Sequence, residues 1–177
     1  MSNFKVAVIL LLLVTIAACS RSATDTQNQP TVANTATEPR RIASTDVVKA
    51  TAQAVDISPG SSAQTTVHLT IQNGYHVNAN PPSYPYLKAT ELEFPSASGI
   101  SVSFIVYPDP ITKKFSFAEK PLAVYEGETT MKVLLKIDKS AKSGAQSFSG
   151  TLRVQACDDQ VCYAPGALNI AIPVTIK

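Results

Sequence analysis

The chain has 177 residues, which is enough for one ordinary domain with additional segments. Charged residues make up 16% of the chain, against roughly 25% in an average globular protein. The formal net charge is only +2 and the basic residues are scattered. A nucleic-acid-binding protein needs a dense Lys/Arg face, so these numbers exclude that class.

The N-terminus resembles a bacterial lipoprotein signal. Lys5 precedes an apolar run over residues 6–16, which ends in Ala-Ala-Cys at Cys19. A run of about eleven residues suits a signal peptide and is too short for the ~20 residues of a transmembrane helix. We therefore predict a signal peptide over residues 1–18 and lipidation at Cys19. The alternative is an ordinary cleaved signal peptide in which this cysteine is incidental. Because Ser20 is not Asp, lipidation would place the protein on the outer membrane of a Gram-negative cell, facing the periplasm.

Residues 19–45 are mostly Ser, Thr, Ala, Gln, Asn and Pro. Such a segment buries too little apolar surface to offset its ordering entropy, so we predict a disordered linker after the acylated cysteine.

Residues 46–177 show the alternation of polar and apolar residues that is typical of half-buried strands. Strands are expected within residues 47–57, 66–71, 90–94, 101–106, 122–126, 131–137, 151–156 and 168–176, about eight or nine in all. Short strands at this spacing, with no helical period, predict an all-β domain, an antiparallel immunoglobulin-like β-sandwich. Two long loops interrupt the pattern at residues 78–88 and 108–121, and the second carries Phe115 and Phe117. Long loops on a small sandwich are often functional.

Apart from Cys19, the chain has two cysteines, Cys157 and Cys162. In an exported protein such a pair favours a disulfide, and four intervening residues allow the chain to turn back. A loop this short gains little stability from a bridge, and a bridge in a loop is open to attack by another thiolate. The residues favour a redox role over a structural one. However, Asp158 and Asp159 would raise a thiol's pKa, which is more typical of a pair whose disulfide is attacked than of an activated nucleophile.

Several stretches of the domain resemble the N-terminal periplasmic domain of DsbD-type thiol:disulfide interchange proteins. The resemblance covers roughly residues 46–177. It is carried by GYHVNANPP at 74–82, YP at 107–108, VYEG at 124–127 and VQACDDQVCYAP at 154–165, and the last of these is the most specific.

The resemblance implies an immunoglobulin-like domain that takes electrons from a thioredoxin-like protein or membrane conduit and passes them to periplasmic disulfide-bearing proteins. It implies that Cys162 forms the mixed disulfide and that Cys157 resolves it. Phe115 or Phe117 would be the aromatic residue of a loop that shields the pair. On this interpretation the chain is a stand-alone lipoprotein and a component of a thiol:disulfide reductase, with no cofactor and no metal.

The cysteine spacing is one residue shorter than the family form, and His76 and Asn78 stand where a tyrosine-rich Tyr-x-Tyr is expected near the pair, beside Tyr163. A histidine there could accept a proton locally, or could be an ordinary hydrogen-bonded loop residue. Two rival functions remain at this point. One is a lipid-anchored binding or adaptor module with a purely structural disulfide. The other is a zinc or copper site built from Cys157, Cys162 and His76 with Asp158 or Asp159, although this spacing is unusual for zinc.

Overall fold

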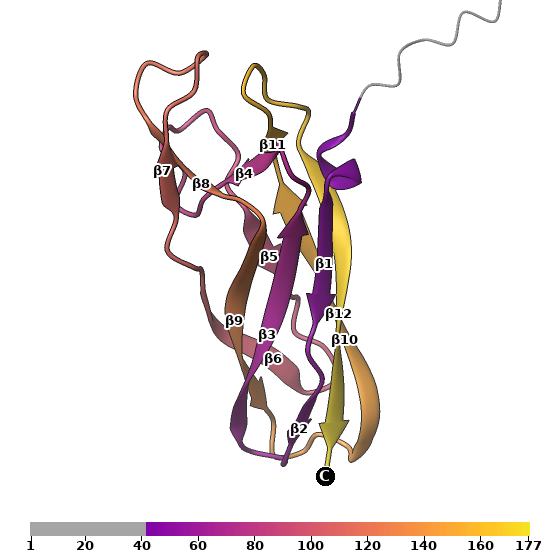
Figure 1. Cartoon of the computed structure of the whole chain (residues 1–177). Coiled ribbons are helices and arrows are strands. Elements are labelled where there is room, and N and C mark those ends of the chain that lie inside the picture. Colours follow the sequence, from indigo (N-terminus) through magenta and orange to yellow (C-terminus); the bar gives the residue numbers. More distant parts are fainter. Residues whose placement is uncertain (1–41) are drawn as a thin grey trace, which may run out of the picture. The chain divides into compact units, whose positions relative to one another are not determined.

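The computed structural model of the protein describes residues 42–177, so that the predicted signal peptide and Cys19 lie outside the described residues. Within this part the chain forms one short 3-10 helix and twelve strands (Figure 1). The helix η1 is Ser44–Asp46, and the strands are β1 Val48–Ala52, β2 Val55–Ile57, β3 Ser62–Ile71, β4 His76–Asn78, β5 Glu91–Glu93, β6 Ile100–Val106, β7 Ile111–Lys113, β8 Leu122–Tyr125, β9 Glu128–Ile137, β10 Gly144–Val154, β11 Ala156–Cys157 and β12 Gly166–Ile176.

Two four-stranded sheets form the layers of a sandwich, with strand orders β1-β3-β9-β6 and β2-β12-β10-β5. The long neighbours β3–β9 and β10–β12 pair antiparallel along their whole lengths, and β2 joins β12 in parallel. The prediction of an all-β, immunoglobulin-like sandwich is therefore confirmed.

The core lies between these two sheets because the strands alternate in burial with a period of two. In β12, Ile170, Ile172, Val174 and Ile176 are buried and the residues between them are exposed. Pro173, which has no N–H to donate, takes one of the exposed positions of this strand. A one-residue slip in pairing would expose the whole apolar set, so the alternation fixes the register.

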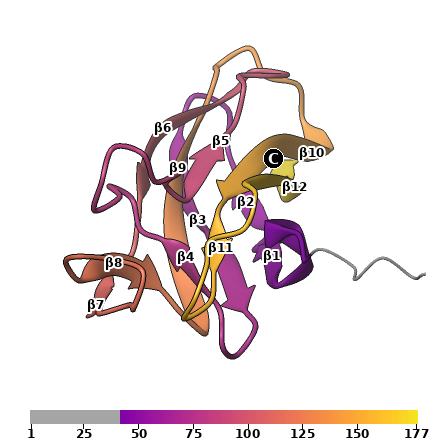
Figure 2. The ribbon, with the colours of Figure 1, turned by 90° about the horizontal axis from the view of Figure 1, so that it is seen from above.

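A third, smaller sheet lies at one end of the sandwich, with the order β11-β4-β8-β7 (Figures 1 and 2). Three of its strands, β4, β8 and β11, directly follow or precede a long strand in the chain. The chain passes from β3 to β4 through a turn at Gly74, from β8 to β9 at Gly127, and from β10 to β11 at Gln155. Both glycines have positive φ, 85° and 60°, which an L side chain rarely adopts. Strands from both layers therefore meet at this end.

Four differences from the predicted elements concern short segments. The strand count is higher than eight or nine because β2, β4, β7 and β11, which have only two or three residues each, were not predicted as separate strands. Residues 47–57 split into two strands. The predicted loop at 108–121 contains β7, which leaves a tip over residues 114–121, and Asn78 belongs to β4 and not to the preceding loop. Segments this short carry no readable periodicity, so only their pairing defines them as strands.

Candidate functional site

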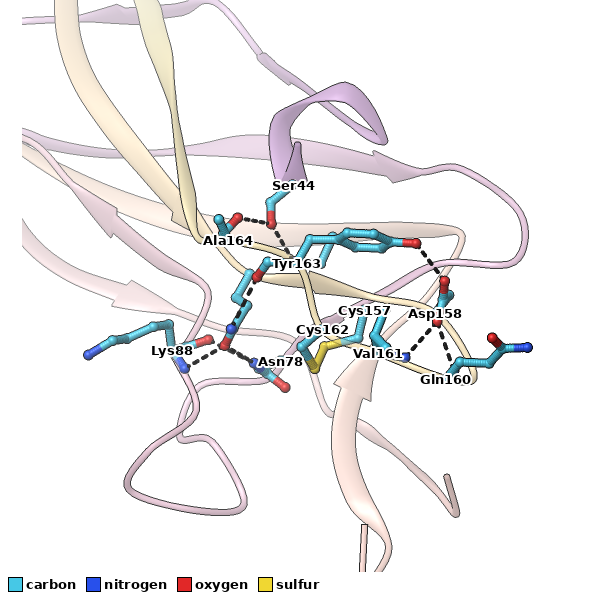
Figure 3. Close-up of a disulfide and its surroundings, with 12 residues drawn as sticks. Ser44, Asn78, Lys88, Cys157, Asp158, Gln160, Val161, Cys162, Tyr163 and Ala164 are labelled. Atoms are coloured by element: carbon cyan, nitrogen blue, oxygen red, sulfur yellow. Dashed lines mark hydrogen bonds between the residues drawn. A yellow bond between two sulfur atoms is a disulfide. The ribbon is translucent and has the colours of Figure 1, made fainter. Parts of the chain in front are cut away.

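The predicted disulfide between Cys157 and Cys162 is present, with the sulfur atoms 1.97 Å and the Cα atoms 3.9 Å apart (Figure 3). The two cysteines face each other as an antiparallel bridge in a narrow hairpin. Tyr163 N donates to the Ala156 carbonyl at 2.8 Å on one side of the pair, and Asp158 N donates to the Val161 carbonyl at 2.9 Å on the other. These bonds hold the two cysteines directly opposite one another.

The hairpin turn is organised by the carboxylate of Asp158. Its Oδ1 accepts hydrogen bonds from Gln160 N at 2.7 Å and Val161 N at 2.8 Å, and its Oδ2 accepts one from the Tyr163 hydroxyl at 2.5 Å (Figure 3). The hydrogen bond from Tyr163 is the largest cause of a lowered pKa of Asp158, and the same bond raises the pKa of Tyr163 to about 12. Asp158 therefore shapes the turn that carries Cys162, a role that its position beside Cys157 did not suggest.

The two sulfur-bearing residues differ in exposure. Cys157 is fully buried at the end of β11, whereas Cys162 is partly exposed on the returning arm of the hairpin and follows the exposed Val161. Thiol–disulfide exchange begins with attack on an accessible sulfur. The geometry thus makes Cys162 the more accessible of the two.

His76 lies beside the buried cysteine. It is the β4 residue paired with Cys157, so that His76, Cys157 and Cys162 are consecutive cross-strand neighbours on one face. The His76 ring is only 1% exposed, and its Nε2 has no hydrogen-bond partner. Burial lowers its pKa from 6.5 to about 4, so the ring is neutral at physiological pH. His76 is therefore a strand residue, which contradicts the alternative that it is an ordinary hydrogen-bonded loop residue.

The tip of the β7–β8 hairpin covers this histidine. We call residues 114–121, which connect β7 to β8, the aromatic loop. Phe115 is 2% exposed and stacks on His76 with ring centroids 4.0 Å apart, whereas Phe117 is 40% exposed and stacks on Phe115 at 5.4 Å. Phe115 belongs to a small apolar cluster separate from the main core, with Leu87, Ala118, Leu122, Val124 and the partly buried Tyr84.

Two polar contacts join the aromatic loop and its base to the disulfide hairpin. The Ser116 hydroxyl donates to the carbonyl of Asp159 at 2.9 Å. Lys113 Nζ lies 3.6 Å from Asp159 Oδ1 and 2.7 Å from Glu126 Oε1, and also 5.3 Å from the Phe115 ring centroid. These contacts place a cation beside the acidic hairpin, although the hairpin itself contains no Lys or Arg.

Asn78, another predicted neighbour of the pair, forms hydrogen bonds with the segments that flank the disulfide hairpin. Asn78 Nδ2 donates to Gln155 Oε1 at 3.1 Å and to the Lys88 carbonyl at 3.0 Å (Figure 3). Gln155 Nε2 in turn donates to the carbonyl of Tyr163 at 3.3 Å. Asn78 therefore fixes the strands that carry the hairpin, and no hydrogen bond joins it to either cysteine.

Three residues of this region were missed by sequence reasoning. Ser44, which falls in the predicted linker, is buried; its hydroxyl donates to the Ala164 carbonyl and accepts from Ala156 N. Lys113 and Ser116 lie more than forty residues from the hairpin they contact. Their only sequence signal was membership of the long loop that carries the two phenylalanines.

Within residues 42–177 no group of three or more His, Cys, Asp or Glu side chains is arranged to hold a metal ion. Both thiols of the metal site considered above are joined in the disulfide. Nothing helical in the same part of the chain is long and apolar enough to cross a membrane.

The fold and the disulfide site agree with a comparison against protein families. Residues 44–172 match the family described as thiol:disulfide interchange protein DsbD, N-terminal. Because this match covers most of the chain, the protein belongs to that family and carries a thiol:disulfide interchange domain. The predicted resemblance is therefore confirmed. No curated protein sequence matches the chain.

Solved structures similar to the chain include two N-terminal domains. One is the DsbD N-terminal domain of Neisseria meningitidis in the reduced form, with 16% identity, a TM-score of 0.44, and coverage of 66% of this chain and 82% of that one. The other is the N-terminal periplasmic domain of ScsB from Proteus mirabilis, with 21% identity, a TM-score of 0.45, and coverage of 69% and 44%. A type I cohesin from Pseudobacteroides cellulosolvens matches at 10% identity and a TM-score of 0.40, over 74% of this chain and 94% of that one.

Proposed function

We propose that the protein is a lipid-anchored periplasmic carrier of electrons that works by thiol–disulfide exchange at Cys157 and Cys162. The observation that carries the proposal is the contrast in exposure across the disulfide, with a buried Cys157 and an accessible Cys162 in a four-residue turn. Membership of the interchange family supports the same chemistry. Cys162 is the sulfur that partners attack, and Cys157 is the resolving cysteine.

Reduction of the pair takes two steps. A thiolate of the donor attacks Sγ of Cys162, the Cys157–Cys162 bond breaks, and its electron pair stays on Cys157 Sγ. The second thiolate of the donor then attacks the donor's own sulfur in the mixed disulfide and releases Cys162 as a thiolate. The donor ends as a disulfide and the pair as two thiols after protonation, so that two electrons have moved. Delivery to an acceptor disulfide is the same sequence in reverse.

The aromatic loop has a protective role in this proposal. Phe115 is buried over His76 and Ser116 is hydrogen-bonded to the hairpin, so the loop limits approach to the pair until a partner displaces it. We assign the shielding role to Phe115 because its ring is buried at the site, whereas Phe117 lies outside it and is 40% exposed.

The donor in this scheme is a thioredoxin-like protein or a membrane electron conduit, and the acceptors are periplasmic proteins that carry disulfides. Lipidation at Cys19, supported by the Ala-Ala-Cys pattern after the apolar run, would keep the domain at the periplasmic face of the outer membrane. Several acyl chains together hold a protein stably on a membrane.

The reduction potential of the pair tests the proposal. The domain is equilibrated in glutathione or dithiothreitol buffers of known potential, and the oxidised fraction is measured by thiol labelling and mass spectrometry. We expect a value in the range of known carriers, roughly −180 to −270 mV. A value far below about −300 mV would make the bond a structural one and would favour the adaptor function.

Trapping of partners tests the assignment of the two cysteines. Cys157→Ala leaves Cys162 able to attack but removes the resolving thiol, so we expect mixed disulfides with periplasmic proteins to accumulate. Cys162→Ala is the matched control and should trap far less, because the remaining thiol is buried. Equal trapping by both variants would contradict the assignment.

A further inference from the structure

His76, which lies beside the disulfide, is a buried polar residue in a position where the fold does not require one. A buried polar atom without a hydrogen-bond partner is uncommon in proteins and calls for an explanation. Nε2 of His76 is such an atom, on a side chain that is 1% exposed. A leucine or phenylalanine at this position of β4 would fill the space without leaving a polar atom unpaired.

The position of His76 relative to the reacting sulfurs supplies the explanation. Directly opposed residues of antiparallel strands have Cβ atoms about 4.5–5.5 Å apart and project from the same face. His76 is opposed to Cys157, and Cys157 is opposed to Cys162. An imidazole therefore stands next to the sulfur that is released whenever the disulfide is reduced.

The chemistry of Cys157 requires a proton carrier at this place. Cys157 is fully buried, and a thiolate in an apolar environment is strongly disfavoured, so its thiol stays protonated. To resolve a mixed disulfide on Cys162, the Cys157 thiol must first lose this proton. Because Cys157 is fully buried, a neighbouring base is better placed than bulk water to take this proton.

We propose that His76 accepts the proton of Cys157 during resolution of the mixed disulfide, and that its stacking under Phe115 keeps it inactive until a partner displaces the aromatic loop. This inference rests on the proposed function. The Cys157 thiol gives its proton to His76 Nε2, and the resulting thiolate attacks Sγ of Cys162. The bond from Cys162 to the partner breaks, and the partner's sulfur leaves as a thiolate. The imidazolium then gives its proton to that thiolate or to water.

The surroundings of His76 agree with a gate, by which we mean control of the basicity of His76 by closure of the aromatic loop. Burial is the largest influence on the ring and disfavours the imidazolium, so displacing Phe115 weakens this influence. The charged groups facing the ring are Glu126 from the end of β8, Asp158 and Asp159 from the disulfide hairpin, and Lys113 from β7. The three carboxylates favour the imidazolium and the lysine opposes it. Once the ring is hydrated, this mostly acidic surrounding makes it a better base than in the closed state.

Transient kinetics with oxidised glutathione as the probe tests the inference. The reduced protein forms a mixed disulfide in a concentration-dependent step, and Cys157 resolves it in a step independent of glutathione. Acid quenching and mass spectrometry follow both. In the wild type we expect the second rate to rise with pH and to level off near neutrality. In His76→Phe, which keeps an aromatic ring for stacking, that step should be on the order of 100-fold slower at pH 7, as expected for loss of a general base. Its pH dependence should then follow the thiol alone.

The second histidine provides a matched control. His68 is exposed on β3, where it contacts Thr66 and Thr130, and His68→Gln should leave both steps unchanged. An unchanged second rate and pH profile in His76→Phe would overturn this inference and leave the proposed function standing. Failure of the wild-type pair to exchange with glutathione would overturn the proposed function, and this inference with it.

A titration by NMR tests the gate without relying on exchange and remains decisive if His76→Phe does not fold. The ring signals of the two histidines are followed against pH in the oxidised protein. The pKa of His76 should lie near 4 in the wild type and move toward 6.5 in Phe115→Ala. An unshifted pKa in that variant would contradict the gating role of Phe115.

Discussion

Replacing Phe115 with alanine should open the site without unfolding the sandwich. Truncating a buried Phe costs about 3–5 kcal/mol. Here the ring packs on His76 and on the small apolar cluster at the end of the domain, and not in the main core. Most of the cost should therefore fall on closure of the aromatic loop. A shift of 3 kcal/mol in the closing equilibrium corresponds to on the order of 100-fold more of the open form.

The assay is the rate at which dithiothreitol reduces the disulfide under native conditions, followed by maleimide labelling and mass shift. If reduction requires the open form, the rate in Phe115→Ala should rise on the order of 100-fold, in proportion to the open population. A urea denaturation curve of the oxidised variant should show a loss of about 3 kcal/mol in the free energy of global unfolding, because the closed form that the substitution destabilises is still the major native form.

Phe117→Ala is the matched control in the same loop. Its ring is 40% exposed, so its loss should cost about 1 kcal/mol and speed reduction less than tenfold. Equal acceleration by the two variants, or none in Phe115→Ala, would refute the argument that burial of Phe115 governs access to the disulfide.

Three further substitutions should have measurable effects. Asp158→Asn should lower the melting temperature at neutral pH, and the gap to the wild type should close below pH 4. The carboxyl pKa of Asp158 is lower in the folded protein than in the unfolded chain, so the ionised carboxylate stabilises the fold at any pH above the unfolded pKa. This stability is lost as the pH falls through the pKa of the folded protein. In the same variant, ultraviolet titration should find the pKa of Tyr163 well below about 12, since the hydrogen bond to Asp158 is the main cause of its elevation. Cys19→Ala should move the mature protein from the membrane fraction to the soluble periplasmic fraction, and unchanged fractionation would count against lipidation. Gly150→Ala should lower the urea midpoint, because its methyl group would collide with the carbonyl oxygen of Glu93 in β5 and with the ring of Phe94, which follows that strand; an unchanged midpoint would contradict this packing.

The long strands could be predicted because their signal is local. In β12, alternate positions from Ile170 to Ile176 are apolar, and a strand with one buried face requires this period wherever it lies in the fold. The disulfide between the two cysteines could also be predicted from the sequence, because only four residues separate them and the chain must turn back within that short segment.

The short strands of the third sheet carry no such signal. Three residues in β4 or β7, and two in β11, cannot display a period, and they are strands because neighbours distant in sequence pair with them. For the same reason no strand was predicted at His76, although its pairing with Cys157 is what brings it to the site.

The sequence by itself determined the alternation that makes the sandwich, the cysteine pair, and the aromatic residues available to shield it. Only the tertiary structure decided their arrangement. Phe115 and Phe117 are two residues apart in the same loop, and what distinguishes them is that His76 lies beneath the first. Lys113 and Ser116 contact a hairpin more than forty residues away. Burial and electrostatics depend on which groups are close in space, and no local pattern of residue types contains that information.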